Sequence, residues 1–560
     1  MTPETTFVPG HILVAPILIP LVAGALMLFY DDRHRQIKLG IGLAALAALF
    51  LVSIELIVRV KGAAEDNGTL VGTYLMGDWP VPIGIVLVLD RLSAMMVMLS
   101  TLLAIPSLIY AAAGWQGKGQ HYHSMFQFLL AGVNGAFLTG DLFNLFVFFE
   151  VMLAASYGLM LHGSGVDRIK QGIHYIGINL AASLLFLLGA GLVYGTTGTL
   201  NMADISRVVP GLDGAQRQLF HAAAAFLGIA FLTKAAIWPL CFWLPPTYAA
   251  ASPPAAASFA IMTKVGLYVI LRLSTLIFGE DAGASAGFGG PALILGGIAT
   301  IAYGTFGVLG AQGVATKGGH MALISSGTVL TATGIAVIGG GQQILTGALY
   351  YLIGSTIAVG AYFLLAETVA RDEKEHSDDD DDGREPEPDY IADRWAPMMG
   401  TVEDEAAPAI GRTGSWTAIG ISFAVLAVII AGLPPFPGFI GKFAMLSGAI
   451  RDNAQVTGMI PAVIWAYAGV LIVSGFAVLI AMMRIGIRRF WASETPAPRI
   501  LALEIVPVVL ILAMIALQTV KSGAVLSYTE DTASALLTPS VYRDAVLSAP
   551  VVGPHEGMEQ

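Results

Sequence analysis

The stretch "TGDLFNLFVFFEVMLAASYGLMLHG", from Thr139 to Gly163, decides the fold class of this chain. Its apolar part reaches the roughly 20 residues that an α-helix needs to cross a bilayer. Glu150 lies in the middle of this run. A charged side chain at the centre of a membrane helix costs about 2.5–3.5 kcal/mol on insertion scales, so it requires a partner, water or a function. The stretch therefore predicts a membrane-spanning helix with a functional carboxylate.

Similar apolar runs recur along the whole chain. Of its 560 residues 56% are hydrophobic and only 12% are charged, whereas soluble domains have roughly 25% charged residues. This composition excludes a soluble globular protein and predicts an all-α polytopic membrane protein. The lengths of the apolar runs and the residues that interrupt them predict about 14 transmembrane helices. These lie at residues 11–29, 38–60, 82–112, 124–139, 142–162, 171–194, 219–250, 254–276, 290–311, 317–339, 343–367, 414–449, 459–484 and 500–520.

Two of these spans, one in each half of the chain, contain helix-breaking prolines. The seventh reads "KAAIWPLCFWLPPTYAAASPP" and the twelfth reads "IIAGLPPFPGFIGKF". Proline removes a backbone donor, and broken membrane helices in both halves of a chain are typical of inverted-repeat transporters, whose functional groups lie near mid-membrane. We therefore expect two inverted five-helix repeats, formed by spans 4–8 and 9–13, with helices 7 and 12 broken.

These repeats define the expected domain organisation. The first repeat is predicted at 124–276, and the second at 290–484, which includes an acidic loop at 368–412. Residues 1–123 supply N-terminal helices 1–3. Residues 485–560 supply helix 14 and a C-terminal tail.

The acidic loop carries the negative charge of the chain. From Glu367 to Glu405 there are 16 acidic and 4 basic residues, while the net charge of the whole chain is −11. A solvated tether is expected, and docking of a basic partner or adaptation to a salty cytoplasm are the alternatives.

Connections after odd-numbered spans carry 16 Lys and Arg residues, whereas the termini and the other connections carry 7. Both termini should therefore face outside, and the acidic loop should face the cytoplasm.

Four charged residues lie clearly within predicted spans: Glu150, Lys234, Lys264 and Lys442. Burial favours the neutral form of a lysine, and a nearby carboxylate favours the charged form. Movement of Glu150 toward or away from Lys234 would therefore make the lysine hold or release its proton, as in a pump. The alternative is a buried ion pair between these two residues that only fixes helix packing.

Other polar residues give weaker indications. His320, beside Lys317 at the start of the tenth span, is a candidate proton relay toward the other lysines, with an ordinary interfacial residue as the alternative. Asp90 and Arg91 are adjacent, and neighbouring helical residues diverge by about 100°. Each of the two is therefore expected to brace a neighbouring span.

The sequence gives no sign of a cofactor. Its single cysteine, Cys241, excludes a disulfide framework and a cysteine-based cluster or zinc site within this one chain. A cytochrome would need inward-facing pairs of histidines on facing helices, and no clear set occurs among the 10 histidines. The sequence leaves open whether a metal ion binds directly to this chain.

Together with "IHYIGINLAASLLFLLGAGLVYGTTGTLNMADI", the stretches quoted above closely resemble the D subunit of the Mrp (Pha, Mnh) multisubunit monovalent cation/proton antiporters. More distantly they resemble the antiporter-like proton-pumping subunits of respiratory complex I. The resemblance covers about residues 10 to 520, and "GDLFNLFVFFEVML" favours the D type. It implies a 14-helix subunit with a proton path along the membrane midplane, in which Glu150, Lys234, Lys264 and Lys442 take the family's essential positions.

The resemblance also implies partners. Such subunits work in the cell membrane with the A, B, C, E, F and G types, exchange sodium, sometimes potassium or lithium, for protons, and use neither a cofactor nor nucleic acid. This sequence departs from the family in "YYLIGST", where Gly354 stands in place of a histidine found in many relatives. Water, or Ser325, Ser326 and Thr328, would then have to complete the route to Lys442.

The sequence thus predicts a transporter subunit rather than an enzyme. Protons would load at Glu150 and Lys234 and pass Lys264 toward Lys442, and the proton motive force would drive cation export. One alternative is a proton-pumping subunit of a redox complex, such as a complex I relative or a hydrogenase. Another is a scaffold, which predicts that all four charged positions tolerate neutral substitution.

Overall fold

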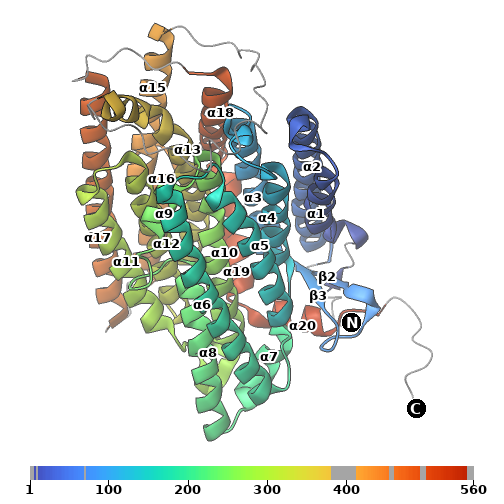
Figure 1. Ribbon diagram of the computed structural model, residues 1–560. Coiled ribbons are helices and arrows are strands. Elements are labelled where there is room, and N and C mark those ends of the chain that lie inside the picture. The colour runs from blue at the N-terminus through green and yellow to red at the C-terminus, as the bar shows by residue number, and fades with distance from the viewer. Residues whose placement is uncertain are drawn as a thin grey trace.

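The computed structural model describes residues 6–7, 10–67, 71–379, 412–452, 459–491 and 500–551. Figure 1 shows an elongated bundle of long helices with a small sheet at one end. The helices are α1 Ala15–Leu28, α2 Arg35–Asn67, α3 Arg91–Ala111, α4 Tyr122–Leu138, α5 Leu142–Leu161, α6 Val166–Thr197, α7 Met202–Val208, α8 Gly214–Lys234, α9 Leu244–Ala250, α10 Pro253–Ile277, α11 Gly290–Gly310, α12 Val314–Val337, α13 Gln342–Asp379, α15 Arg412–Ala431, α16 Pro437–Asp452, α17 Met459–Gly486, α18 Ala502–Val520, α19 Ser522–Leu536 and α20 Pro539–Leu547. The strands are β1 Thr6–Phe7, β2 Val71–Leu75 and β3 Val86–Leu89.

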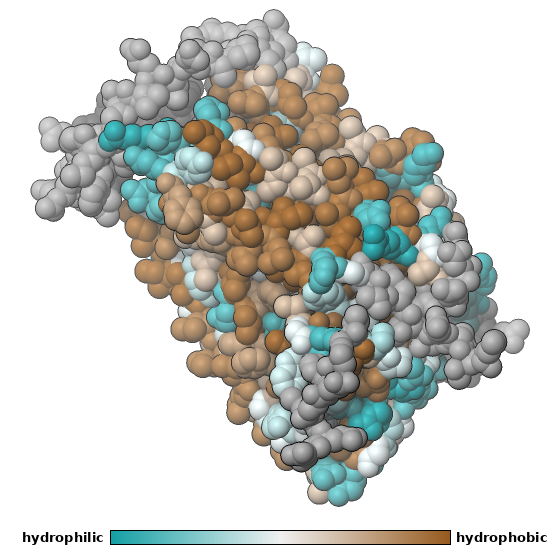
Figure 2. All heavy atoms as spheres, turned by 90° about the vertical axis from the view of Figure 1, so that its right-hand side faces the viewer, coloured by the Kyte–Doolittle hydropathy of each residue, from teal (hydrophilic) through white to brown (hydrophobic). Residues whose placement is uncertain are grey.

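The bundle has the surface of a membrane protein. Within the described ranges, ten helices are long and apolar enough to cross a membrane, and two shorter apolar helices, Ala15–Leu28 and Thr417–Ala431, accompany them. Figure 2 shows a broad belt of hydrophobic side chains on one side of the molecule, with hydrophilic side chains toward its ends. On α2, Leu51 is 66% exposed, as expected for contact with lipid. The chain is therefore a mostly helical, multi-pass membrane protein.

The predicted start of the third span is wrong. The sequence predicts this span at 82–112, but Val86–Leu89 forms strand β3, and α3 begins only at Arg91. A capping box fixes this boundary, because the Asp90 carboxylate accepts from Ser93 N at 2.8 Å and the Ser93 hydroxyl accepts from Asp90 N at 2.9 Å. Strand β3 pairs antiparallel with β2, and β2 pairs parallel with β1. The chain is therefore not purely α-helical.

The C-terminal region also contains more structure than the predicted tail, because α19 and α20 follow α18. The Tyr528 hydroxyl of α19 donates to Arg91 O at 2.8 Å, and Gln342 Nε2 at the start of α13 donates to Glu530 O at 3.1 Å. The starts of α3 and α13 therefore meet at the end of the bundle where α20 packs against β2 (Figure 1). Helix α13 leads from there to the opposite end. Most of the predicted acidic loop lies outside the described residues.

Both helix breaks predicted from proline are confirmed. Residues 235–243 separate α8 from α9, and residues 432–436 separate α15 from α16. Ala236 has a φ of 55° and Gly432 a φ of 79°, left-handed conformations that end a helix. The first break directly follows Lys234, the last residue of α8.

The centre of the bundle is formed by α10, α12 and α13. All residues of α10 are buried, and nearly all residues of α12 are buried as well. Polar side chains on these helices are thus shielded from lipid, and they need hydrogen-bond partners inside the protein.

Candidate functional site

Glu150 of α5 and Lys234 of α8 are connected by Ser183 of α6. The Ser183 hydroxyl donates to Glu150 Oε1 at 2.5 Å and accepts from Lys234 Nζ at 3.3 Å. The ammonium group also lies 5.0 Å from the centre of the Phe149 ring. Because Lys234 is only 6% exposed, groups of the protein rather than bulk water must stabilise its charge.

Local structure fixes the position of both charged groups. The Asp141 carboxylate caps α5 by accepting from Phe143 N at 2.8 Å and Asn144 N at 2.9 Å. This cap sets the start of the helix that carries Glu150. At the end of α8, Trp243 Nε1 donates to Thr233 O at 3.2 Å, so the chain after the break folds back onto the last turn of α8.

The Ser183 bridge is suited to proton transfer, because a hydroxyl is both a donor and an acceptor. Within the described residues, Glu150 and Lys234 interact through this hydroxyl and not in a direct ion pair. The sequence predicted that these two residues act together, but it did not single out Ser183. The only signal was a serine in an apolar helix, and such serines commonly bond to the carbonyl of their own preceding turn.

Lys264 of α10 lies deep in the bundle and is 2% exposed. Its Nζ donates to Ser325 Oγ at 3.0 Å and to Ser326 Oγ at 3.2 Å, both on α12. The Ser325 hydroxyl in turn lies 2.9 Å from Ser355 Oγ of α13. The structure thus brings Lys264 together with both serines singled out from the sequence, and adds Ser355 to them.

Lys442 of α16 lies at the second helix break. Its Nζ donates to Ala431 O, the last residue of α15, at 3.4 Å, and lies 6.0 Å from the centre of the Tyr351 ring. It lines a cavity of about 270 Å³ together with apolar residues such as Phe476 of α17. Among the described residues no hydrogen bond links Lys442 directly to Lys264.

The two other relay candidates face α11. Lys317 Nζ donates to Val308 O and Ala311 O, and thereby binds carbonyls at the C-terminal end of α11. His320 packs against Tyr303, with the ring centres 5.9 Å apart, and against Gly307, where a Cβ would be 2.1 Å from His320 Nδ1. In the described part of the chain neither side chain contacts the Lys264 cluster.

A large cavity, which the sequence does not indicate, lies at the end of α13 that leads into the acidic loop. Its volume is about 830 Å³, and Trp115, Arg168 and Glu367 are among its lining residues. The Glu367 carboxylate accepts from Tyr110 Oη at 3.0 Å and Trp115 Nε1 at 3.1 Å. Arg168 Nε donates to Ala250 O at 2.8 Å, which ties the start of α6 to the end of α9.

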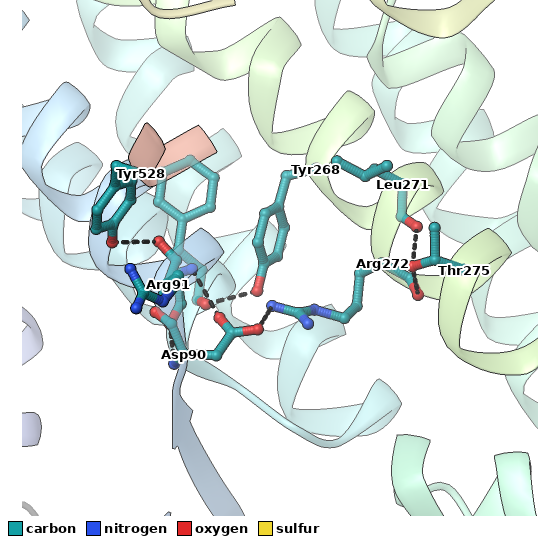
Figure 3. Close-up of polar contacts among 9 residues, drawn as sticks. Asp90, Arg91, Tyr268, Leu271, Arg272, Thr275 and Tyr528 are labelled. Atoms are coloured by element: carbon teal, nitrogen blue, oxygen red, sulfur yellow. Dashed lines mark hydrogen bonds and ion pairs between the residues drawn. The ribbon is translucent and has the colours of Figure 1, made fainter. Parts of the chain in front are cut away.

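At the opposite end, Asp90 and Arg91 each brace another helix (Figure 3). Asp90 contacts α10, a predicted span, whereas Arg91 contacts α19, which lies in the predicted C-terminal tail. Asp90 Oδ2 lies 2.6 Å from Arg272 Nη2 of α10, and this ion pair is buried. Arg91 Nη1 lies 3.2 Å from Asp531 Oδ2 of α19, and the guanidinium lies 5.5 Å from the centre of the Tyr528 ring. The start of α3 is thus locked to α10 and α19.

The described side chains form no group of three or more His, Cys, Asp or Glu residues that could hold a metal ion. Cys241 is buried and unpaired as a thiol. The chemistry available at the site is therefore that of amines, a carboxylate and hydroxyl groups.

Comparisons with known proteins identify the family of the chain. Residues 139–381 match the family described as NADH:quinone oxidoreductase/Mrp antiporter, TM. The chain is 47% identical over 549 residues to the D subunit of a probable K(+)/H(+) antiporter of Rhizobium meliloti (strain 1021), covering 97% of this chain and 98% of that protein. It is 33% identical over 548 residues to the D subunit of the Na(+)/H(+) antiporter of Alkalihalophilus pseudofirmus, covering 96% of this chain and 99% of that protein.

A solved structure shares the fold. A chain of the Mrp complex from Dietzia sp. DQ12-45-1b superposes with a TM-score of 0.77 at 24% identity, covering 98% of this chain and 100% of that one. The two sequence relatives are similar over almost their whole length. The chain therefore belongs to the family of D subunits of multisubunit cation/proton antiporters.

Proposed function

We propose that this chain is the proton-translocating subunit of an antiporter complex that exports Na⁺ or K⁺ at the expense of the proton motive force. The observation that carries the proposal is the buried bridge from Glu150 through Ser183 to Lys234 at the first helix break. A carboxylate and an amine joined by a hydroxyl exchange protons, whereas the amine repels a cation. The relatives are named as parts of K(+)/H(+) and Na(+)/H(+) antiporters, which supports a monovalent cation as the second substrate.

Water would reach the bridge from the large cavity over α9. Tyr248 lines this cavity, and its ring packs against Trp243 with the centres 6.3 Å apart. Trp243 bonds to Thr233 O, directly before Lys234. The two aromatic residues therefore connect the lining of the cavity to the backbone beside Lys234. A small movement of these residues would change proton access to Lys234.

The first break also packs against the helix that carries the next lysine of the path. Gly266 of α10 packs against Ala235, the residue after Lys234, and a Cβ at position 266 would be 2.8 Å from Ala235 N. This close approach places α10, which carries Lys264, directly against the start of the first break.

The architecture proposed for this function has 14 membrane crossings and two inverted five-helix repeats, at 124–276 and 290–484. The repeats would give each half one broken helix with a lysine beside it, as observed at α8–α9 and α15–α16. The complex would reside in the cell membrane with both termini outside and the acidic loop in the cytoplasm. Its other members would be subunits of the A, B, C, E, F and G types.

Transport by the complete complex tests the proposal. The purified complex is reconstituted in proteoliposomes with an imposed pH gradient, and Na⁺, K⁺ or Li⁺ is added in separate arms. An antiporter dissipates the gradient when the right cation is added, without any electron donor. A proton-pumping subunit of a redox complex, the alternative raised by the wider family, would move protons only during electron transfer.

A further inference from the structure

An apolar groove lies beside α8, which begins at the end of the bundle that carries α7 (Figure 1). The groove has a volume of about 260 Å³, and most of its lining residues come from α8, α10 and the start of α11. Among the described residues that line it, only Ser274 of α10 has a polar side chain. The groove opens on the outside of the bundle, where its lining residue Ile229 is 42% exposed. In a membrane protein such an apolar opening meets lipid rather than water.

The length of the groove matches one leaflet of a bilayer. Along α8 it extends from Phe220 to Leu232, and these 12 steps correspond to about 18 Å at ~1.5 Å per residue. Half of the hydrocarbon core, which is about 30 Å thick, is about 15 Å. The inner end lies two residues before Lys234, the last residue of α8, and the outer end lies near the first turn of α8. An acyl chain has this length, whereas a membrane-spanning helix of another subunit would need a groove about twice as long.

Two side chains near the first turn of α8 are suited to bind a phosphate at the outer end of the groove. The His221 ring stacks on the lining residue Phe288 with the ring centres 4.0 Å apart, and its Nε2 lies 3.0 Å from Ser285 Oγ. Arg217 lies one turn before His221, and its Nη2 donates to Leu212 O at 2.9 Å. A guanidinium has five N–H donors, so Arg217 has more donors than this bond uses. Such donors bind phosphate oxygens strongly.

We propose that a phospholipid binds at this site, with one acyl chain in the groove and its phosphate at Arg217 and His221. The inner end of the chain lies against Phe231, whose ring centre is 5.9 Å from that of Phe149. The Phe149 ring centre in turn lies 5.0 Å from Lys234 Nζ. The lipid thus covers the aromatic side of the first break with hydrocarbon. The site goes beyond the proposed function, because it would exist whether or not the chain carries protons.

The test is photolabelling of the complete complex with phosphatidylglycerol that carries a diazirine near the end of one acyl chain, with the labelled peptides located by mass spectrometry. The wild-type complex should be labelled on α8 between Phe220 and Leu232. Gly228→Leu fills the groove without a clash, because a Cβ at this lining position has no neighbour within 4 Å, and should lower the labelling about fivefold or more. The matched control is Gly191→Leu on α6, where a Cβ also has no neighbour within 4 Å and which lies outside the groove; it should be labelled like the wild type.

Arg217→Gln tests the position of the phosphate. It should lower the labelling about fivefold or more with phosphatidylglycerol and with phosphatidylethanolamine alike, since both lipids carry the phosphate. Wild-type labelling of α8 in assembled Gly228→Leu or Arg217→Gln complexes would overturn the inference. A wild-type complex without label on α8 would overturn it as well, and this result is expected if a helix of another subunit covers the groove. Should Gly228→Leu not assemble, Ala225→Leu, at another lining position of α8, takes its place under the same criterion.

Discussion

Removal of the Ser183 hydroxyl is the sharpest perturbation of the bridge at the first helix break. In Ser183→Ala, Glu150 loses a donor at 2.5 Å and Lys234 loses an acceptor at 3.3 Å. A hydrogen bond to a charged group contributes about 1.5–3 kcal/mol. Because ~1.4 kcal/mol corresponds to a factor of ten in rate, loss of one such bond from the transfer step should slow transport roughly 10- to 150-fold.

The assay uses inside-out vesicles that contain the complete complex, with the cation-induced collapse of a pH gradient followed by a fluorescent dye. Ser183→Thr keeps the hydroxyl and should retain most of the activity. The control is Thr196→Val on the same helix, since the Thr196 hydroxyl bonds only to Leu192 O at 2.9 Å and Val193 O at 3.0 Å. Wild-type transport by a fully assembled Ser183→Ala complex would refute the bridge as a step in proton transfer.

Three further substitutions test the parts that hold the site in place. Asp90→Asn leaves the buried guanidinium of Arg272, 2.6 Å from Asp90, without its counter-charge, and should lower the stability of the purified complex by about 3–5 kcal/mol in thermal unfolding; an unchanged melting temperature would contradict this. Asp141→Ala removes the cap of α5 and should cost about 1 kcal/mol in the same measurement, whereas Asp141→Asn should cost less. Lys317→Met removes a cation from the C-terminal carbonyls of α11 and should cost roughly 0.3–1 kcal/mol, with flux per assembled complex within about twofold of wild type. A complete loss of flux in that variant would instead support a relay role for Lys317.

The features of the fold that could be predicted are those whose residues cost free energy inside a membrane helix. Proline clusters located both helix breaks, since proline lacks the donor that a continuous helix needs. Charges in apolar runs singled out Glu150, Lys234, Lys264 and Lys442, because a membrane helix rarely carries such residues without a use. The structure places Lys234 at the first helix break and Lys442 beside the second helix break.

The remaining parts of the site depend on how helices are rotated against each other, and apolar runs do not report this. Ser183 bonds to residues of two other helices, and a hydroxyl in an apolar run does not show which neighbour it faces. His320 illustrates the same difficulty, because its position in the chain placed it near the lysines while its ring packs against Gly307. The short apolar run at 86–89 fits a strand as well as a helix, so the start of α3 was placed too early.

The charge of Glu150 is the most direct test of proton translocation by this chain. Glu150→Gln keeps an oxygen that accepts from Ser183, but removes the negative charge that stabilises the ammonium of Lys234. The measurement is cation-dependent proton flux by the complete complex in proteoliposomes under an imposed pH gradient. We predict that the assembled Glu150→Gln complex exchanges no protons for cations. Exchange at the wild-type rate would contradict it.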